Sequence, residues 1–158
     1  MTHFETTILR QSGVTLDSDL ADTATARANI FDMTEATEAA VLRPRDFGGF
    51  PHDLRAALAA RVARLAGDEY LALHFATDAE DRIALADPSA TDAELAGVLA
   101  FVDKVANQTR DITADDILAL QAAGVSDADI VRLCELVAFL AYQTRVIAGL
   151  RLMQGVAP

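Results

Sequence analysis

A histidine inside an apolar segment is the residue best suited to chemistry in this chain. His74 lies among Leu71, Leu73 and Phe75 and follows the polar stretch 68–70. An imidazole with an ordinary pKa of about 6.5 can accept or donate a proton near neutral pH, so His74 is a candidate general acid or base. The alternative is a histidine that only forms hydrogen bonds inside a helical bundle. Residue type and position leave both interpretations open.

Cys134 is the only cysteine, which excludes an intramolecular disulfide, a CxxC redox pair and a zinc site with two thiolates. Its neighbours are apolar apart from Arg132 and the adjacent Glu135, and a reactive thiolate needs exposure and nearby positive charge. We therefore expect a buried cysteine that packs as a small hydrophobe, with weak one-cysteine peroxidase activity as the alternative. The three histidines show no metal-ligand spacing, so the sequence predicts neither a metal nor a cofactor.

Arginines form the one basic concentration in an acidic sequence: Arg43, Arg45, Arg55, Arg61 and Arg64. They are candidates for binding a small acidic metabolite, and the alternative is that they pair with nearby carboxylates. Arg145 interrupts the apolar final helix and needs an acid, a helix C-terminus or a ligand anion. Arg61 and Arg145 are therefore the candidate anion-binding residues.

Length and charge limit the class of protein. The chain has 158 residues, 52% of them hydrophobic, and a formal net charge of -11. These values fit one globular domain whose negative field disfavours nucleic-acid binding. The first residues show no basic region and no apolar run of secretory length, so we expect no secretory leader. The longest unbroken apolar run, 136–142, is too short to span a bilayer. We expect a cytoplasmic protein that does not enter a membrane.

Helix signals dominate and predict an all-α protein of about six helices. Residues 1–16 are expected to be an irregular lead-in, and 17–42 one or two helices whose best-marked piece is 34–42, with Glu35 and Glu38 in its early turns. The loop 47–51 separates an N-terminal extension, 1–45, from a helical domain, 46–158. Caps and spacing predict further helices near 51–67, 91–106, 113–124 and 126–153. Another helix is predicted to begin at 68, to fade through the acidic run 77–82 and to stop by 87–88.

The final helix is apolar on nearly every side between Leu133 and Leu150. A helix of this kind must be buried, and we expect it both at the centre of the bundle and across a subunit interface.

Several separated passages resemble the carboxymuconolactone decarboxylase/alkylhydroperoxidase D superfamily. They are residues 54–74, 112–116, 120–127 and 137–145, and the later ones are similar to the peroxidase-related branch. The resemblance covers roughly residues 45–155. It implies an alkylhydroperoxidase D-like helical bundle that forms trimers or hexamers.

Redox members of this family carry a glutamate, a CxxC pair and a histidine, and this chain has none of them in place. The matching positions are Ala56 for the glutamate, Asp68 and Leu71 for the cysteines, and Phe75 for the histidine. Peroxide reduction of this type needs an attacking and a resolving thiol, so the resemblance implies a degenerate redox site.

Three functions follow from the resemblance. The leading one is a small-molecule-binding or accessory protein without thiol peroxidase activity, either homo-oligomeric or assembled with a cysteine-bearing relative. The second is a non-redox enzyme of the decarboxylase kind with His74 as acid or base. That branch has a Glu-Leu-x-x-His pattern, which residues 71–74 match in part, with Tyr70 at the glutamate position as a candidate binding residue. The third is the weak peroxidase through Cys134.

Overall fold

A computed structural model describes residues 2–156. The regular secondary structure of these residues consists only of helices, which confirms the all-α prediction. Residues 157–158 of the predicted helical domain lie outside this range. The α-helices are α1 (Thr7–Ser12), α2 (Ala21–Ala26), α3 (Ala28–Leu42), α4 (His52–Leu65), α5 (Glu69–Ala76), α6 (Ala96–Asn107), α7 (Ala114–Ala122) and α8 (Asp127–Met153). The same residues also form three short 3-10 helices: η1 (His3–Glu5) before α1, η2 (Glu80–Ala86) between α5 and α6, and η3 (Thr109–Asp111) between α6 and α7.

Three of the predicted helix starts are confirmed, and each is capped by the residue that predicted it. Asp68 accepts a hydrogen bond from the Leu71 N–H at 3.0 Å and begins α5. Thr113 forms a capping box with Asp116 before α7, and Ser126 caps α8 through the Asp129 N–H. These short polar side chains satisfy N–H groups that the first turn of a helix leaves unpaired.

Three expectations about local structure were wrong. Residues 1–16 are not an irregular lead-in, because Ile8 and Leu9 of α1 are buried in the core. The helix that begins at residue 68 ends at Ala76 and does not fade through 77–82, because the 3-10 helix η2 follows there as a separate element. Helix α6 begins at Ala96 and not at Thr91, because the Asp92 carboxylate accepts the N–H groups of Glu94 and Leu95 and closes a turn first.

Helix α4 is the one surrounded on all sides. Residues 54–63 are all buried, and α4 packs against α5, η2, α6 and α8. Its many alanines let neighbouring helices approach closely, because a methyl group fills little space. The sequence analysis had instead predicted that the final helix, 126–153, lies at the centre of the bundle.

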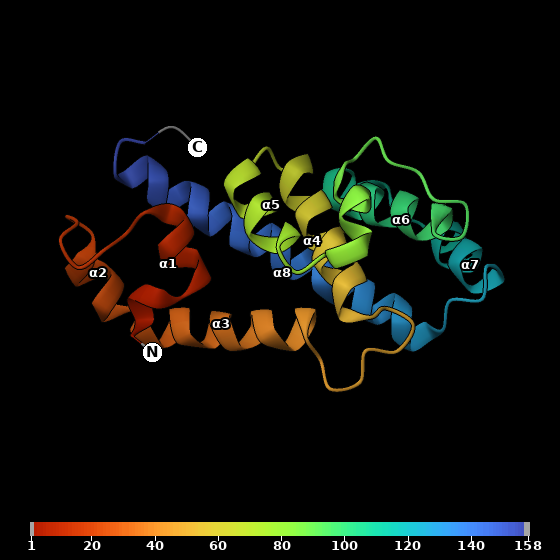
Figure 1. Cartoon of the computed structure of the whole chain (residues 1–158), viewed down its shortest axis with the longest axis horizontal. Coiled ribbons are helices and arrows are strands. Elements are labelled where there is room, and N and C mark those ends of the chain that lie inside the picture. Colours follow the sequence, from red (N-terminus) through yellow and green to blue (C-terminus); the bar gives the residue numbers. More distant parts are fainter. Residues whose placement is uncertain (1, 157–158) are drawn as a thin grey trace.

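Helix α8 runs along the molecule behind the other elements, with α1 and α2 at one end and α6 and α7 at the other (Figure 1). One side is in the core through Leu133, Leu136, Leu140 and Ile147. The opposite side leaves Val131 and Tyr142 exposed, so within one chain the helix is not buried all round. By length and composition α8 could cross a membrane, as can many core helices of soluble proteins.

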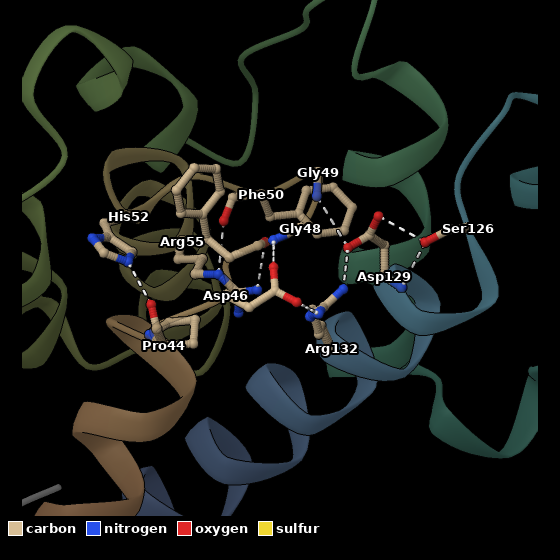
Figure 2. Close-up of polar contacts among 11 residues, drawn as sticks. Pro44, Asp46, Gly48, Gly49, Phe50, His52, Arg55, Ser126, Asp129 and Arg132 are labelled. Carbon is tan, nitrogen blue, oxygen red and sulfur yellow. Dashed lines mark hydrogen bonds and ion pairs between the residues drawn. The ribbon is translucent and has the colours of Figure 1, made fainter.

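The loop between α3 and α4 is held in place by charges (Figure 2). The buried Arg55 donates to the carbonyl oxygens of Val41, Phe47 and Phe50. Arg132 of α8 bridges Asp46 and Asp129, and the Gly49 N–H donates to Asp129. These contacts fix the α3–α4 connection against the start of α8.

Gly48 is required in this loop. Its φ is +58°, and a Cβ there would collide with the side chains of Asp129 and Arg132. A side chain at this φ would therefore be strained, and its Cβ would force the ends of the Asp129 and Arg132 side chains to shift.

Asp129 makes this contact dependent on pH. Burial alone would raise its pKa, but hydrogen bonds from Gly49, Ser126 and Arg132 outweigh burial and hold the pKa below its ordinary value. A lowered folded-state pKa stabilises the fold above the unfolded pKa of about 4, and this stabilisation disappears as the pH falls through the folded value.

We expect Asp129→Asn to lower the free energy of unfolding by about 1–2 kcal/mol at pH 7, because a charged acceptor becomes neutral. The difference in the free energy of unfolding between this variant and the wild type should be smaller at pH 3. Urea denaturation at both pH values measures it, with Asp127→Asn, an exposed acid in the same helical turn, as the control. Equal losses at pH 7 and pH 3 would contradict the role assigned to the Asp129 charge.

Candidate functional site

A buried carboxylate faces His74 from the N-terminal extension. Glu38 of α3 is only 4% exposed, and its Oε1 atom lies 3.9 Å from Nε2 of His74 on α5. The His74 side chain is 29% exposed, so its ring connects this interior acid with the surface. The His74 imidazole therefore lies beside the buried carboxylate of Glu38, which the sequence interpretation had not assigned to any site.

Two other helices hold Glu38 in place. The Thr7 hydroxyl of α1 donates to Glu38 Oε1 at 2.9 Å, and Nε2 of Gln143 in α8 donates to Oε2. The Thr7 N–H also donates to Glu35 at 2.7 Å, which ties the start of α1 to α3. Because both oxygens have partners, the carboxylate is fixed in one orientation toward His74.

This geometry is typical of a carboxylate–imidazole pair. The carboxylate orients the ring and stabilises the positive charge that forms when the imidazole takes up a proton. A separation of 3.9 Å is within ion-pair range and longer than a hydrogen bond, as is common in catalytic pairs without substrate. The pair is therefore equipped for proton transfer.

Glu38 was missed because the sequence interpretation took 34–42 as the best-marked helical piece of 17–42. In that piece Glu38 falls in an early turn, where the helix dipole stabilises an acidic side chain. In the structure it lies near the end of α3, on the buried stripe Phe31, Thr34, Glu38 and Leu42. The useful signal was the spacing of three, four and four, because a charged residue on an apolar stripe is rarely buried without a reason.

The four positions that match the family's redox relay hold no redox group. Ala56, Leu71 and Phe75 are buried apolar residues. Asp68 is the α5 cap and forms an ion pair with Arg151 at 2.8 Å. Each of these side chains therefore has a packing or capping role.

Arg61 is occupied by the protein itself. It forms a two-pronged ion pair with Asp103 at 2.6 and 2.7 Å. Its other N–H groups donate to the carbonyl oxygens of Leu85, Asp87 and Pro88. These contacts account for all five donors of a guanidinium, so the geometry favours the structural alternative over metabolite binding.

Arg145 lies at a pocket that contains neither member of the Glu38–His74 pair. It is exposed there, in a space of about 220 Å³ lined by residues of α4, α6 and α8, where water can solvate it without an acid. Tyr70 is one helical turn before His74 on α5, is 75% exposed and has the Arg151 guanidinium 6.0 Å from its ring centre. Of the predicted binding residues, the structure therefore places Tyr70 on the same helix as His74 and gives Arg61 and Arg145 other surroundings.

The remaining titratable candidates show no metal-binding arrangement. Within residues 2–156, no group of three or more His, Cys, Asp or Glu side chains is placed to hold a metal ion. His52 contacts the Pro44 carbonyl and His3 contacts Thr25, both at exposed sites.

Comparison of the chain with family models, with curated proteins and with solved structures finds no match. The superfamily resemblance therefore stays an expectation.

Cys134 is half-buried, and burial, followed by the charge of Glu135, raises the pKa of its thiol. A raised pKa lowers the thiolate fraction near neutral pH, and the thiolate is the reactive form. We expect iodoacetamide at pH 8 to modify the folded chain at least about tenfold more slowly than the chain unfolded in urea. Mass spectrometry follows the single adduct. Equal rates in the two states would mean that Cys134 is a reactive thiol.

Proposed function

We propose that this chain is a helical protein of the carboxymuconolactone decarboxylase/alkylhydroperoxidase kind that binds a small molecule and lacks thiol peroxidase activity. The Glu38–His74 pair transfers a proton in that molecule. One observation carries the proposal, the buried Glu38 carboxylate 3.9 Å from a partly exposed His74.

The absence of thiol chemistry is supported by the residues at the relay positions. Peroxide reduction needs a thiolate and a second thiol to resolve the sulfenic acid. The two matching cysteine positions hold Asp68 and Leu71, and the single cysteine is on α8 with a raised pKa. Asp68 is paired with Arg151, which leaves that carboxylate engaged in the fold.

Proton transfer follows from the arrangement of the pair. The His74 imidazole takes a proton from an acidic C–H or O–H group of the substrate and becomes an imidazolium. The Glu38 carboxylate stabilises that charge, and Thr7 and Gln143 keep Glu38 from turning away. The imidazolium then returns the proton to another atom of the substrate, so the net reaction is an isomerisation or the start of a bond cleavage.

The substrate class implied by the resemblance is a lactone that carries a carboxylate. Arg61 is engaged by Asp103, and Arg145 lies in a pocket that contains neither Glu38 nor His74, so the geometry gives no support to these arginines as the carboxylate-binding residues. Proton transfer by the pair requires only an acidic C–H group beside a carbonyl group, so a simple lactone tests that step separately from carboxylate binding.

The proposal predicts that His74 catalyses proton exchange in a simple unsaturated lactone. We expect the wild type to speed deuterium uptake from D₂O into α-angelica lactone, followed by proton NMR. His74→Gln should lower the rate roughly a hundredfold, the lower range for general acid–base catalysis. Glu38→Gln should give an intermediate rate, because the neutral amide no longer stabilises the imidazolium.

His52→Gln is the matched control, since His52 is an exposed histidine whose ring contacts the Pro44 carbonyl oxygen and not a carboxylate. Its rate should equal that of the wild type. An unchanged rate in His74→Gln would contradict the proposal, as would a wild-type rate equal to that of free imidazole at the same concentration.

A second candidate function, an accessory subunit, is favoured by the exposed side of α8. Val131 near the start of α8 and Leu152 and Met153 at its end are more than half exposed, so both ends of the helix offer apolar side chains to a partner. A trimer, a hexamer or an assembly with a cysteine-bearing relative would cover them.

Native mass spectrometry of the protein purified from its own source tests this candidate. A mixed assembly would support the accessory role and move the catalytic question to the partner. A homo-oligomer or a monomer would count against that role and leave the Glu38–His74 pair as the site.

A further inference from the structure

Helix α8 carries a regular stripe of residues on its outer side. Successive members are four, three, four, three and four residues apart, which is the heptad spacing of helices that pack along one another. All of them are exposed except the last, which is half-buried. This outer stripe consists of Val131, Glu135, Ala138, Tyr142, Arg145 and Gly149.

The two charged members of the outer stripe have no partner in their own chain. Neither Glu135 nor Arg145 belongs to an ion pair formed among residues 2–156. They cannot pair with each other, because ten residues of helix separate them by about 15 Å. Two opposite charges placed apart on one exposed stripe are suited to a partner that presents the same charges in reverse order.

A second α8 helix in the antiparallel direction presents that reverse order. When two such helices cross at residue 140, each residue faces the one that lies equally far on the other side of 140. Glu135 then faces Arg145 of the second copy, and Arg145 faces its Glu135. A parallel pair would instead place Glu135 against Glu135 and Arg145 against Arg145, and like charges repel. The charges therefore favour the antiparallel direction.

The sizes of the other side chains match in the same register. Ala138 faces Tyr142 of the second copy, and Val131 faces its Gly149, so a large residue meets a small one at each position. Gly149 has room for its neighbour, because a Cβ atom there would have no contact within 4 Å among the described residues. Alternation of large and small residues lets two helices pack closely.

Apolar surface beside the outer stripe would be covered by such a partner. The groove between α3 and α8 has a volume of about 640 Å³, and Glu135 and Tyr142 of the outer stripe line it together with Met33 and Phe139. Met33 is 64% exposed. A second copy that is seated on the outer stripe borders this groove, and apolar area removed from water stabilises association.

We infer that two copies of this chain associate through the outer stripe, with their α8 helices antiparallel and Glu135 of each copy paired with Arg145 of the other. The two-fold symmetry of this arrangement makes every contact occur twice. The inference goes beyond the proposed proton transfer and does not rest on it, because neither Glu38 nor His74 belongs to the outer stripe.

Charge reversal tests the pairing, with sedimentation equilibrium of the full chain as the measurement. We expect the wild type to be a dimer. Glu135→Arg or Arg145→Glu alone sets like charges against each other at two places, and should raise the dissociation constant at least about tenfold. The double variant restores both pairs with their charges exchanged, so its dissociation constant should return close to that of the wild type.

Glu94→Arg is the matched control for Glu135→Arg. It makes the same change of charge at an exposed acid before α6 and should leave the dissociation constant unchanged. The double variant keeps the net charge of the wild type, so its recovery cannot result from the overall charge of the chain.

Disulfide cross-linking tests the direction of the two helices. All variants carry Cys134→Ala, which removes the native thiol. Val131→Cys alone should form no disulfide, because antiparallel packing separates the two copies of residue 131 by about 27 Å along the helices. Val131→Cys combined with Gly149→Cys should link the two chains on a non-reducing gel.

Other results would overturn the inference. These are a wild-type monomer or trimer, single reversals that leave the dissociation constant unchanged, a double reversal that does not restore association, or a disulfide formed by Val131→Cys alone. A hexamer that each single reversal splits into trimers would support the same two-fold contact. His74→Gln should leave association unchanged, so failure of the proton-transfer proposal is distinguishable from failure of this one.

Discussion

The fold depends on satisfying one buried negative charge. Glu38 is almost fully enclosed, and a carboxylate taken out of water is costly unless hydrogen bonds or opposite charges surround it. Its partners come from three other helices, Thr7 from α1, His74 from α5 and Gln143 from α8. Burying this acid therefore requires α1, α3, α5 and α8 to meet, and the same requirement places an imidazole beside a fixed carboxylate.

Buried arginines also require hydrogen-bond partners from several parts of the chain. The chain has 13 lysine and arginine residues against 24 acids, yet Arg55 and Arg61 are buried in α4. Arg55 holds the loop before α4 through backbone carbonyls, and Arg61 holds the region after η2 through carbonyls and Asp103. A guanidinium has five donors in a fixed plane, which suits it to gather several acceptors at once. Internal packing thus explains two of the five arginines in the basic concentration, Arg55 and Arg61, whereas Arg43 and Arg64 pair with exposed acids.

Local signals predicted the structure well, and long-range contacts limited the prediction. The caps at Asp68, Thr113 and Ser126 act within one turn, so the sequence alone identifies them. Helix α1 was missed because six residues with one apolar pair carry almost no periodic signal, and its stability comes from packing on α8. His74 was found by its residue type. Glu38 and Gln143 were not assigned, because their partners lie 31 to 105 residues away.

The extension and the helical domain therefore share one site. The resemblance covers residues from about 45 onward and places its relay on α4 and α5, where Ala56, Leu71 and Phe75 now fill space. The carboxylate that faces His74 comes instead from α3, before that boundary. A domain that began at residue 46 would keep the histidine and Gln143 but lose Glu38 and Thr7. If proton transfer is the activity, the first 45 residues supply Glu38, one of the two members of the pair. The boundary predicted at the loop 47–51 then does not separate a functional domain from an extension.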